Sequence, residues 1–541
     1  MTDIENLNPE PDRLKRKRWR RWGPYLAERQ WGTVREDYST SGSYWDYFPF
    51  DHARSRAYRW GEDGIAGISD DQQLLCLSVA LWNHRDPFLK ERLFGLTNSE
   101  GNHGEDVKEC YYYLDALPSH AYLKMLYKYP QRSFPYDELR MQNRERGKRL
   151  QEFELLDTGC FEEDRYFDVV VEYAKASPDD ILMLITVHNR GPQSAPIDVL
   201  PQLWFRNTWS WKEDVSKPVL YQLDEGVVEA RHLDLEPFFL YAEGPPPFLF
   251  CENVTHPSRI QGFDKAHGFF KDAFHDFVVN GHLNAVNPLH TGTKAAAHYS
   301  LMVQPGAPQS LMLRLTNHRI PLPFEDFGML VSKRRDETDA FYAELQSGVR
   351  DEDERRVQRQ ALAGMIWSKQ FYYYDVWEWF KGDPLQPPPP RERRLGRNRG
   401  WQHLNNADVI SMPDKWEFPW YATWDLAFHC VTFALIDPQF SKDQLTLFTL
   451  ERFMHPNGHL PAYEGGFSDV NPPVHAWAAW KIYEMDRARN HGKGDLRFLE
   501  SIFHKLLLNF TWWVNKKALR GSHVFQAGFL GLDNIGIFDR G

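Results

Sequence analysis

One carboxylate of the chain stands out for its surroundings: Asp425, in the sequence Trp420-Tyr-Ala-Thr-Trp-Asp425. It follows two tryptophans, Trp420 and Trp424, at the expected junction between a loop and a helix. Burial against indole rings would favour the protonated form of this carboxyl group, as a general acid requires. The helix N-terminus would act in the opposite direction and favour the anion. From spacing alone, Asp425 fits a general acid and a simple helix cap equally well.

The chemistry that such an acid would serve is cleavage of a glycosidic bond. This reaction needs two carboxyl groups, one protonated and one ionised, and they stand roughly 6.5–9.5 Å apart in enzymes that invert the anomeric configuration. Glu464 and Asp469 are further candidates, because they lie near Tyr463 and beside glycines that allow close approach of backbone to a ligand. Asp533 and Asp539 have a similar context, and all four are also typical turn or cap residues.

Aromatic residues are the second signal for a sugar ligand. They make up 15% of the 541 residues and include 20 Trp, and an indole face packs well on the C–H face of a sugar ring. The stretch 371–379 is too aromatic to lie wholly within a core. We therefore expect substrate subsites to be lined by Trp420, Trp424, Trp377, Trp379 and Tyr463, with polar contacts from Glu464 and Asp469.

Several other classes of function are disfavoured. The net charge of -11 argues against nucleic-acid binding, and the sequence lacks the motifs of phosphate-binding loops, zinc proteases and serine hydrolases. The 5 cysteines are dispersed without CxxC spacing, which favours reduced thiols over a zinc site. Neither a secretion signal nor a membrane-spanning stretch is recognisable. We expect a cytoplasmic protein with a carbohydrate partner, no cofactor and no metal ion.

The secondary structure that must position these residues is expected to change from strands to helices near residue 320. Before it, short apolar runs bounded by Pro, Gly, Asn or Asp recur at 166–173, 181–187, 199–205, 238–242 and 298–303. This pattern favours an antiparallel sandwich over a doubly wound sheet. Helical patterns are expected to interrupt the strands at 70–81 and 106–126.

After residue 323 the apolar residues recur with the period of a helix. Helices are expected at 325–345, 353–374, 424–436, 441–455, 472–485 and 495–517. Ser441 with Gln444 predicts a capping box, and Asn471 before Pro472 predicts an N-cap. Long loops between successive helices are typical of a helical toroid whose site lies on one rim. These helices amount to about half of a toroid, so we expect the sequence to stop half-way round it.

Four longer strings resemble glycoside hydrolase family 63, the processing α-glucosidase I group, in its long bacterial form. They are residues 21–38, 370–379, 420–425 and 528–536. The resemblance implies an N-terminal β-sandwich domain over residues 1–320 and the first half of an (α/α)6 toroid over residues 321–541. It also implies inverting hydrolysis of α-glucosidic bonds in oligosaccharides or small glucosides, like a mannosyl-oligosaccharide glucosidase. The family's general acid corresponds to Asp425.

The family's general base is a Glu near the end of the toroid, and no segment of this sequence matches it. We therefore expect the base beyond residue 541, and we expect residues 1–541 alone to be inactive and prone to aggregate. Other readings stay open: a hydrolase for trehalose or mannosylglycerate, a non-catalytic carbohydrate-binding protein, or a structural scaffold.

Overall fold

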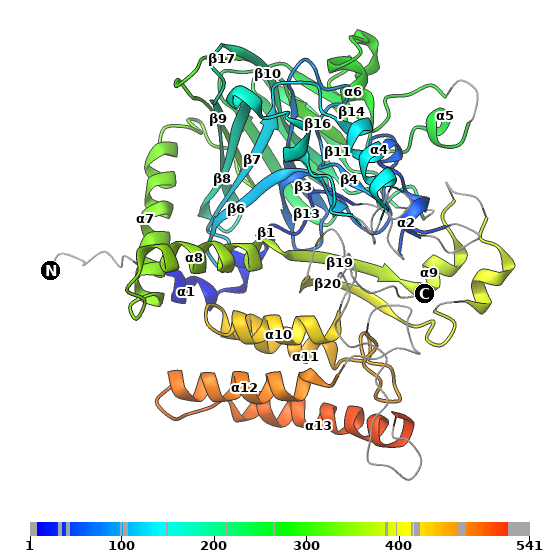
Figure 1. Ribbon diagram of the computed structural model, residues 1–541, viewed down its shortest axis with the longest axis vertical. Coiled ribbons are helices and arrows are strands. Elements are labelled where there is room, and N and C mark those ends of the chain that lie inside the picture. The colour runs from blue at the N-terminus through cyan, green and yellow to red at the C-terminus, as the bar shows by residue number, and fades with distance from the viewer. Residues whose placement is uncertain are drawn as a thin grey trace. The chain divides into compact units, whose positions relative to one another are not determined.

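The computed structural model describes residues 8–30, 35–38, 44–97, 100, 106–147, 150–212, 215–262, 266–384, 388–396, 398–412, 415, 422–462 and 472–517. The chain forms two compact units (Figure 1). Unit 1 comprises Met1–Trp31 and Phe48–Trp367, and unit 2 comprises Gly32–Tyr47 and Ser368–Gly541. The architecture mixes helices with antiparallel sheets.

Unit 1 contains, within the described residues, a seven-stranded and a nine-stranded antiparallel sheet. In spatial order the first holds β1 (Trp22–Gly23), β2 (Ile65–Asp70), β3 (Leu75–Trp82), β10 (Ala195–Phe205), β16 (Lys294–Ala297) and β14 (Phe248–Cys251), with β17 (Tyr299–Val303) also paired to β10. The second holds β15 (Thr291–Gly292), β11 (Val219–Asp224), β12 (Val227–His232), β13 (Leu235–Ala242), β18 (Gln309–Thr316), β9 (Asp180–Asn189), β8 (Tyr166–Ser177), β7 (Tyr122–Pro130) and β6 (Cys110–Ala116).

Side chains from the two sheets meet in the interior of unit 1. The Tyr173 hydroxyl on β8 donates to the carbonyl of Ala66 on β2 at 2.8 Å. Trp22 on β1 packs edge-on against Phe238 on β13, with ring centroids 5.2 Å apart. All five strand regions expected between residues 166 and 303 are confirmed as β8, β9, β10, β13 and β17.

The two helical segments expected at 70–81 and 106–126 are wrong. Residues 75–82 form strand β3, which is buried along nearly its whole length and therefore reads as a continuous apolar run. Residues 110–130 form the hairpin of β6 and β7, where Lys124 and Lys128 alternate with buried Met125, Tyr127 and Tyr129. That two-residue period is the signature of a strand with one covered face.

Two long helices cover part of the nine-stranded sheet within unit 1. The α8 helix (Glu352–Trp367) packs along β6, and α7 (Phe327–Leu345) packs on β7 and β8. Arg335 of α7 forms an ion pair with Glu172 of β8 at 2.7 Å, and Tyr342 donates to the carbonyl of Ala116 at 2.8 Å. Unit 1 thus includes two helices that the expected division at residue 320 assigns to the second domain, and that division stays a prediction.

Smaller elements complete the described part of unit 1. Its helices are α1 (Glu10–Leu14), α3 (Phe50–Ala53), α4 (Tyr136–Arg146), α5 (Pro257–Ile260) and α6 (Ala273–Val278), and β4 (Gly95–Leu96) pairs with β5 (Asp106–Val107).

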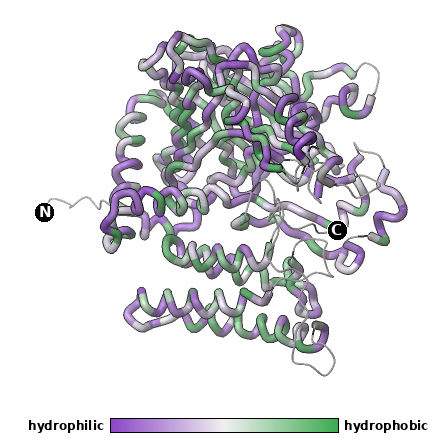
Figure 2. Tube along the Cα trace, viewed as in Figure 1, coloured by the Kyte–Doolittle hydropathy of each residue, from purple (hydrophilic) through white to green (hydrophobic). Residues whose placement is uncertain are grey.

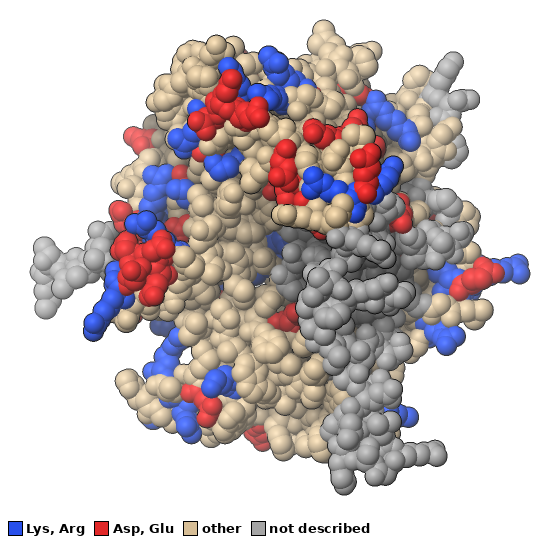
Figure 3. Space-filling model, viewed as in Figure 1, with Lys and Arg blue, Asp and Glu red and all other residues tan. Residues whose placement is uncertain are grey.

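Acidic and basic side chains are interspersed on the described face drawn in Figure 3. No helix among the described residues is long and apolar enough to span a bilayer.

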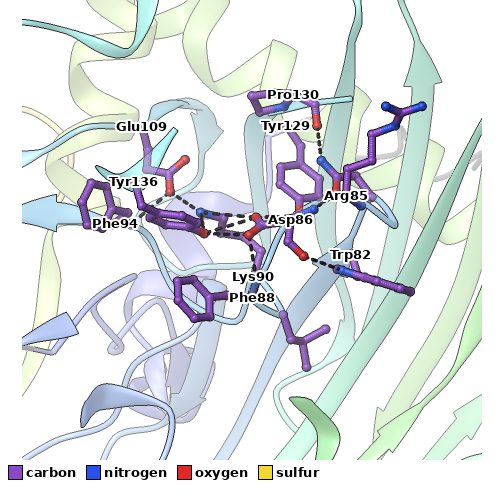
Figure 4. Close-up of polar contacts among 12 residues, drawn as sticks. Trp82, Arg85, Asp86, Phe88, Lys90, Phe94, Glu109, Tyr129, Pro130 and Tyr136 are labelled. Atoms are coloured by element: carbon purple, nitrogen blue, oxygen red, sulfur yellow. Dashed lines mark hydrogen bonds and ion pairs between the residues drawn. The ribbon is translucent and has the colours of Figure 1, made fainter. Parts of the chain in front are cut away.

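A buried ionic cluster lies within unit 1 (Figure 4). The Lys90 ammonium contacts the Glu109 carboxylate at 2.7 Å and donates to the Tyr136 hydroxyl at 2.8 Å. Tyr136 in turn donates to Asp86 at 3.1 Å, and Tyr129 donates to Asp86 at 2.9 Å. The side chains of Lys90, Asp86 and Glu109 are wholly inaccessible. One lysine therefore compensates two buried carboxyl groups.

Unit 2 combines the two-stranded sheet of β19 and β20 with helices. Its described elements are α2 (Tyr44–Tyr47), β19 (Lys369–Asp375), α9 (Val376–Lys381), η7 (Arg391–Leu395), β20 (Asn405–Ser411), α10 (Thr423–Phe433), α11 (Pro438–Phe448), α12 (Val474–Arg489), α13 (Leu496–Trp512) and the π-helical turn η8 (Trp513–Lys517). Lys442 of α11 ties three of the helices together, because it pairs with Asp486 of α12 at 3.2 Å and with Asp495, the N-cap of α13, at 3.0 Å.

The structure corrects several helix boundaries. The helix expected at 353–374 ends at Trp367, and the following aromatic run is strand β19. The N-cap of α11 is Asp437, not Ser441, whose hydroxyl donates to the carbonyl of Cys430. The α12 helix begins at Val474 with Pro473 as its N-cap; the expected cap Asn471 lies outside the described residues.

Hydrophobic residues recur along α10 and α13 (Figure 2). The apolar side chains of α13 are only partly covered in the structure. Ile502 is buried, whereas Phe503 and Phe510 are 56% and 62% exposed. An exposed apolar surface of this kind favours association with other surfaces.

Candidate active site in the helical unit

The candidate acid Asp425 lies in the first turn of α10. Ala422 occupies the N-cap position and makes no side-chain capping bond, so Asp425 is the third helical residue and not the cap itself. Asp425 and the neighbouring Trp424 are both partly buried. The sequence-based placement of Asp425 at a loop-to-helix junction, next to an indole, therefore agrees with the local structure.

The start of α10 is fixed by the loop that follows α11. The Thr423 hydroxyl donates to the carbonyl of Pro461 at 2.5 Å, and the Thr423 backbone N–H donates to the carbonyl of Ala462 at 3.3 Å. The second bond satisfies a backbone N–H of the first helical turn that lacks a partner inside the helix. Both bonds also place Trp424 and Asp425 beside the residues 460–462.

The part of that loop just before Leu460 is held by α13. The Asn509 side chain donates to the carbonyl of Gly458 at 2.8 Å, and the His459 ring stacks on Trp512 with centroids 4.2 Å apart. Gly458 has a φ of +91°, and a Cβ there would lie 2.3 Å from the carbonyl oxygen of Leu508. Only glycine fits this approach, so the loop has little freedom to shift.

A small hollow adjoins the first turn of α10. It is lined by Thr423, Trp424, Leu460, Pro472, Pro473, Val474, His475, Asn509 and Trp513. Its volume of about 20 Å³ is enough for one water molecule. The start of α10, the start of α12 and the end of α13 thus converge at Thr423 and Trp424, the two residues that precede the candidate acid.

His475 is a residue of this hollow that the sequence analysis missed. Its ring is buried, and its Nε2 has no hydrogen-bond partner among the described residues. Burial lowers the pKa of His475 to about 4, and burial does the same to His429 on α10, whose Nδ1 lies 2.9 Å from the Ser411 hydroxyl. Both imidazoles are therefore neutral near pH 7.

These two histidines predict a loss of stability in mild acid. In the unfolded chain they bind protons near pH 6.5, and in the folded chain only near pH 4. Stability is therefore fully present above pH 6.5 and falls as the pH drops toward 4, by about 1.4 kcal/mol per pH unit for each imidazole. Urea unfolding at pH 7.5 and pH 5, followed through peptides of unit 2 by hydrogen exchange, measures this slope.

The control for this prediction is a histidine on the surface. His475→Gln removes one of the two titrations and is expected to reduce the dependence on pH, whereas His504→Gln, on the exposed face of α13, should leave it unchanged. An unaltered slope in His475→Gln would contradict the assignment.

The aromatic residues after β19 occupy different environments. Trp377 is 55% exposed, while Trp379 is 2% exposed and lies under the Arg393 guanidinium at 3.4 Å from its ring centroid. Arg393 also donates to the carbonyl of Asp37 at 3.1 Å and stacks over Tyr38. The N-terminal residues 35–38 thus belong to the packing of unit 2. Trp377 has an accessible ring face, and Trp379 serves mainly as support in this arrangement.

The remaining expected site residues cannot be placed. Trp420, Tyr463, Glu464 and Asp469 lie outside the described residues. Of the site proposed from the sequence, Asp425 and Trp424 are described as neighbours in the first turn of α10, and their role in a site stays a prediction.

A family model gives an independent indication about this region. Residues 418–527 match the model of the mannosylglycerate hydrolase MGH1-like glycoside hydrolase domain. The matched range begins seven positions before Asp425 and includes α10, α11, α12 and α13. The match supports a glycoside hydrolase-like domain and does not single out family 63.

A relative in Saccharomyces cerevisiae, the uncharacterized protein YMR196W, is 44% identical to this chain over 585 residues. The alignment covers 99% of this chain and 54% of the yeast protein. The chain therefore spans about half the length of this curated relative.

Solved structures of carbohydrate-active proteins match more weakly. A candidate kojibiose phosphorylase from the human microbiome is 10% identical, with a TM-score of 0.30 and coverage of 84% of this chain and 55% of that one. A GH92 α-mannosidase from Bacteroides thetaiotaomicron is also 10% identical, with a TM-score of 0.28 and coverage of 64% and 42%. Likeness at these scores supports no structural conclusion. What the comparisons show is a glycoside hydrolase-like domain across the helices that carry Asp425.

Proposed function

We propose that the protein is an inverting glycoside hydrolase that cleaves α-glucosidic bonds of oligosaccharides or small glucosides. The observation that carries the proposal is the glycoside hydrolase-like match over residues 418–527, within which Asp425 occupies the first turn of a helix beside a partly buried indole. In this proposal Asp425 is the general acid, and it protonates the oxygen of the leaving sugar. The two-sheet unit 1 corresponds to the sandwich domain, and α10 to α13 belong to the toroid.

An inverting mechanism requires a second catalytic group besides the general acid. A second carboxylate must activate a water molecule on the opposite face of the sugar ring. We assign this role to no described residue, so the base stays a prediction and turnover is best measured with the full-length protein. Trp424 and the exposed Trp377 are the described aromatic residues proposed to contact sugar rings.

A second substrate has specific support, because the matching family model is that of mannosylglycerate hydrolases. The α-mannosidic bond of mannosylglycerate makes the same demand for an acid and a base as an α-glucosidic bond. A substrate comparison should therefore include mannosylglycerate beside maltose, trehalose and maltotriose.

The anomer released first tests the proposal directly. Proton NMR during early turnover of maltotriose should show β-glucose before mutarotation, because inversion at an α-linked carbon gives the β product. Initial release of α-glucose would contradict the inverting mechanism. Saturable sugar binding without turnover of any substrate would instead favour the non-catalytic carbohydrate-binding protein.

A further inference from the structure

A second hollow in unit 2 is far larger than the one beside Trp424. It lies between the loop that precedes β20 and the loop that follows α11, and its volume is about 700 Å³. Cavities of roughly 300–1,000 Å³ are typical of small-molecule sites. Its lining includes Trp401, Gln402 and Asn405 on one wall and Glu451, Arg452 and His455 on the other.

The two walls of this cleft are fixed relative to each other by a hydrogen bond and an ion pair. The Asn406 side chain of β20 donates to the carbonyl of Arg452 at 2.8 Å. The Arg452 guanidinium pairs with Asp408, also on β20, at 3.1 Å. The β20 strand is itself fixed by its ladder with β19. Because the walls are already tied, a ligand would lose less free energy in ordering them.

An aromatic pair forms one side of the cleft. Trp401 and His455 pack with ring centroids 5.6 Å apart and an interplanar angle of 66°. The backbone N–H of Asn457 donates to His455 Nδ1 at 3.2 Å, which places the ring proton on Nε2. Trp401 is only 5% exposed, so the pair mainly shapes the apolar wall of the cleft, and recognition of a ligand falls to the polar side chains around it.

Polar side chains around the pair are available to a ligand. Gln402, His403 and Glu451 are exposed at the cleft, and within the described part of the chain none of the three makes a hydrogen bond or ion pair. An amide and a carboxylate together offer donors and acceptors that suit neighbouring hydroxyl groups. The charges around the cleft balance, because Asp408 pairs with Arg452 and Glu451 offsets Arg399, and this balance suits an uncharged ligand.

We propose that this cleft, between the loops 399–407 and 451–456, is a saccharide-binding subsite separate from the reacting bond. The loop 451–462 links it to the candidate acid, because His455 and Pro456 line the cleft while Pro461 and Ala462 bind the start of α10. The inference rests on the proposed function in taking a glycan as its ligand. The loop 399–407 lies outside the matched family range.

The test is sugar binding by the full-length protein carrying Asp425→Asn, which is expected to slow turnover enough for a binding measurement. Titration of maltotriose, followed by calorimetry and tryptophan fluorescence, gives the dissociation constant. Replacing both Gln402 and Glu451 by Ala should weaken maltotriose binding about thirtyfold, since two hydrogen bonds are lost and each contributes on the order of 1 kcal/mol. The matched control replaces Gln439 and Asp443, an exposed pair on α11, by Ala.

The outcomes separate this inference from the proposed function. Weaker binding in the cleft variant alone supports the subsite, even if the wild type shows no turnover and the hydrolase proposal fails. Equal binding in the cleft and control variants overturns the subsite, even if turnover depends on Asp425. Tighter binding of inorganic phosphate than of maltotriose, lost in the cleft variant, also overturns it.

Discussion

Asp425→Asn lowers the turnover of maltotriose by about 10²–10⁴-fold and leaves maltotriose binding unchanged, if Asp425 is the general acid. The substitution keeps the size and shape of the side chain, so the first turn of α10 is preserved. Asparagine has no proton to give to the leaving oxygen, and only the reaction step is therefore affected. Steady-state kinetics on the full-length protein, with calorimetry for binding, separates the two quantities.

A substrate whose leaving group needs no proton gives a stricter test of this role of Asp425. α-Glucosyl fluoride loses fluoride without needing a proton, so Asp425→Asn should impair its hydrolysis much less than that of maltotriose. The matched control is Asp443→Asn, the same change at an exposed position on α11. Equal losses for both substrates would mean that Asp425 supports the fold or orients the sugar instead of donating a proton.

The elements that the sequence predicts correctly are those specified by nearby residues. The run before Asn189-Arg190-Gly191-Pro192 ends as strand β9, because the turn residues stop it locally. The start of α10 was also predicted, since the apolar helical pattern begins just after a loop rich in aromatic residues. Asp437 followed by Pro438 carried a clear N-cap signal for α11, and the capping-box pattern at Ser441 obscured it.

The predictions that failed depend on contacts between distant residues. The aromatic run after Trp367 becomes a strand because β20 pairs with it residue by residue, from Lys369 opposite Ser411 to Asp375 opposite Asn405. Local periodicity could not reveal a partner strand whose paired residues lie 30 to 42 positions away. Likewise, strand β3 reads as a helix until its pairing with β10 is known.

In the candidate site, too, associations between sequence neighbours could be predicted, and contacts between distant residues could not. Asp425 and Trp424 are sequence neighbours, so their association was predictable. His475 enters the hollow only because the start of α12 reaches the start of α10. Trp401 and Glu451 are fifty positions apart and meet only through the anchoring of Arg452 on β20. The run Trp401-Gln-His-Leu-Asn405, an aromatic residue among amides, was the one available signal for the cleft.

Lys90→Met is expected to cause the largest loss of stability in unit 1, about 3–5 kcal/mol. Lys90 is the cation between two buried carboxyl groups, Glu109 at 2.7 Å and Asp86 at 3.9 Å (Figure 4). Burial already raises the pKa of both carboxyl groups. Methionine fills similar volume but leaves both groups without compensation. Hydrogen exchange of peptides from β6 and β7 in increasing urea reports the loss within the intact chain.

The dependence of this loss on pH identifies its cause. Without the ammonium, Asp86 and Glu109 bind protons more tightly in the folded state than in the unfolded state. Stability of the variant should then fall as the pH rises from 5 to 7.5, so the difference from wild type is smaller at pH 5. Lys217→Met is the control, because Lys217 pairs with Glu252 at the same 2.7 Å but is 48% exposed, and its loss should stay below about 1 kcal/mol. Similar losses in the two variants, or a loss at Lys90 that does not change with pH, would show that packing and not charge compensation makes Lys90 important to unit 1.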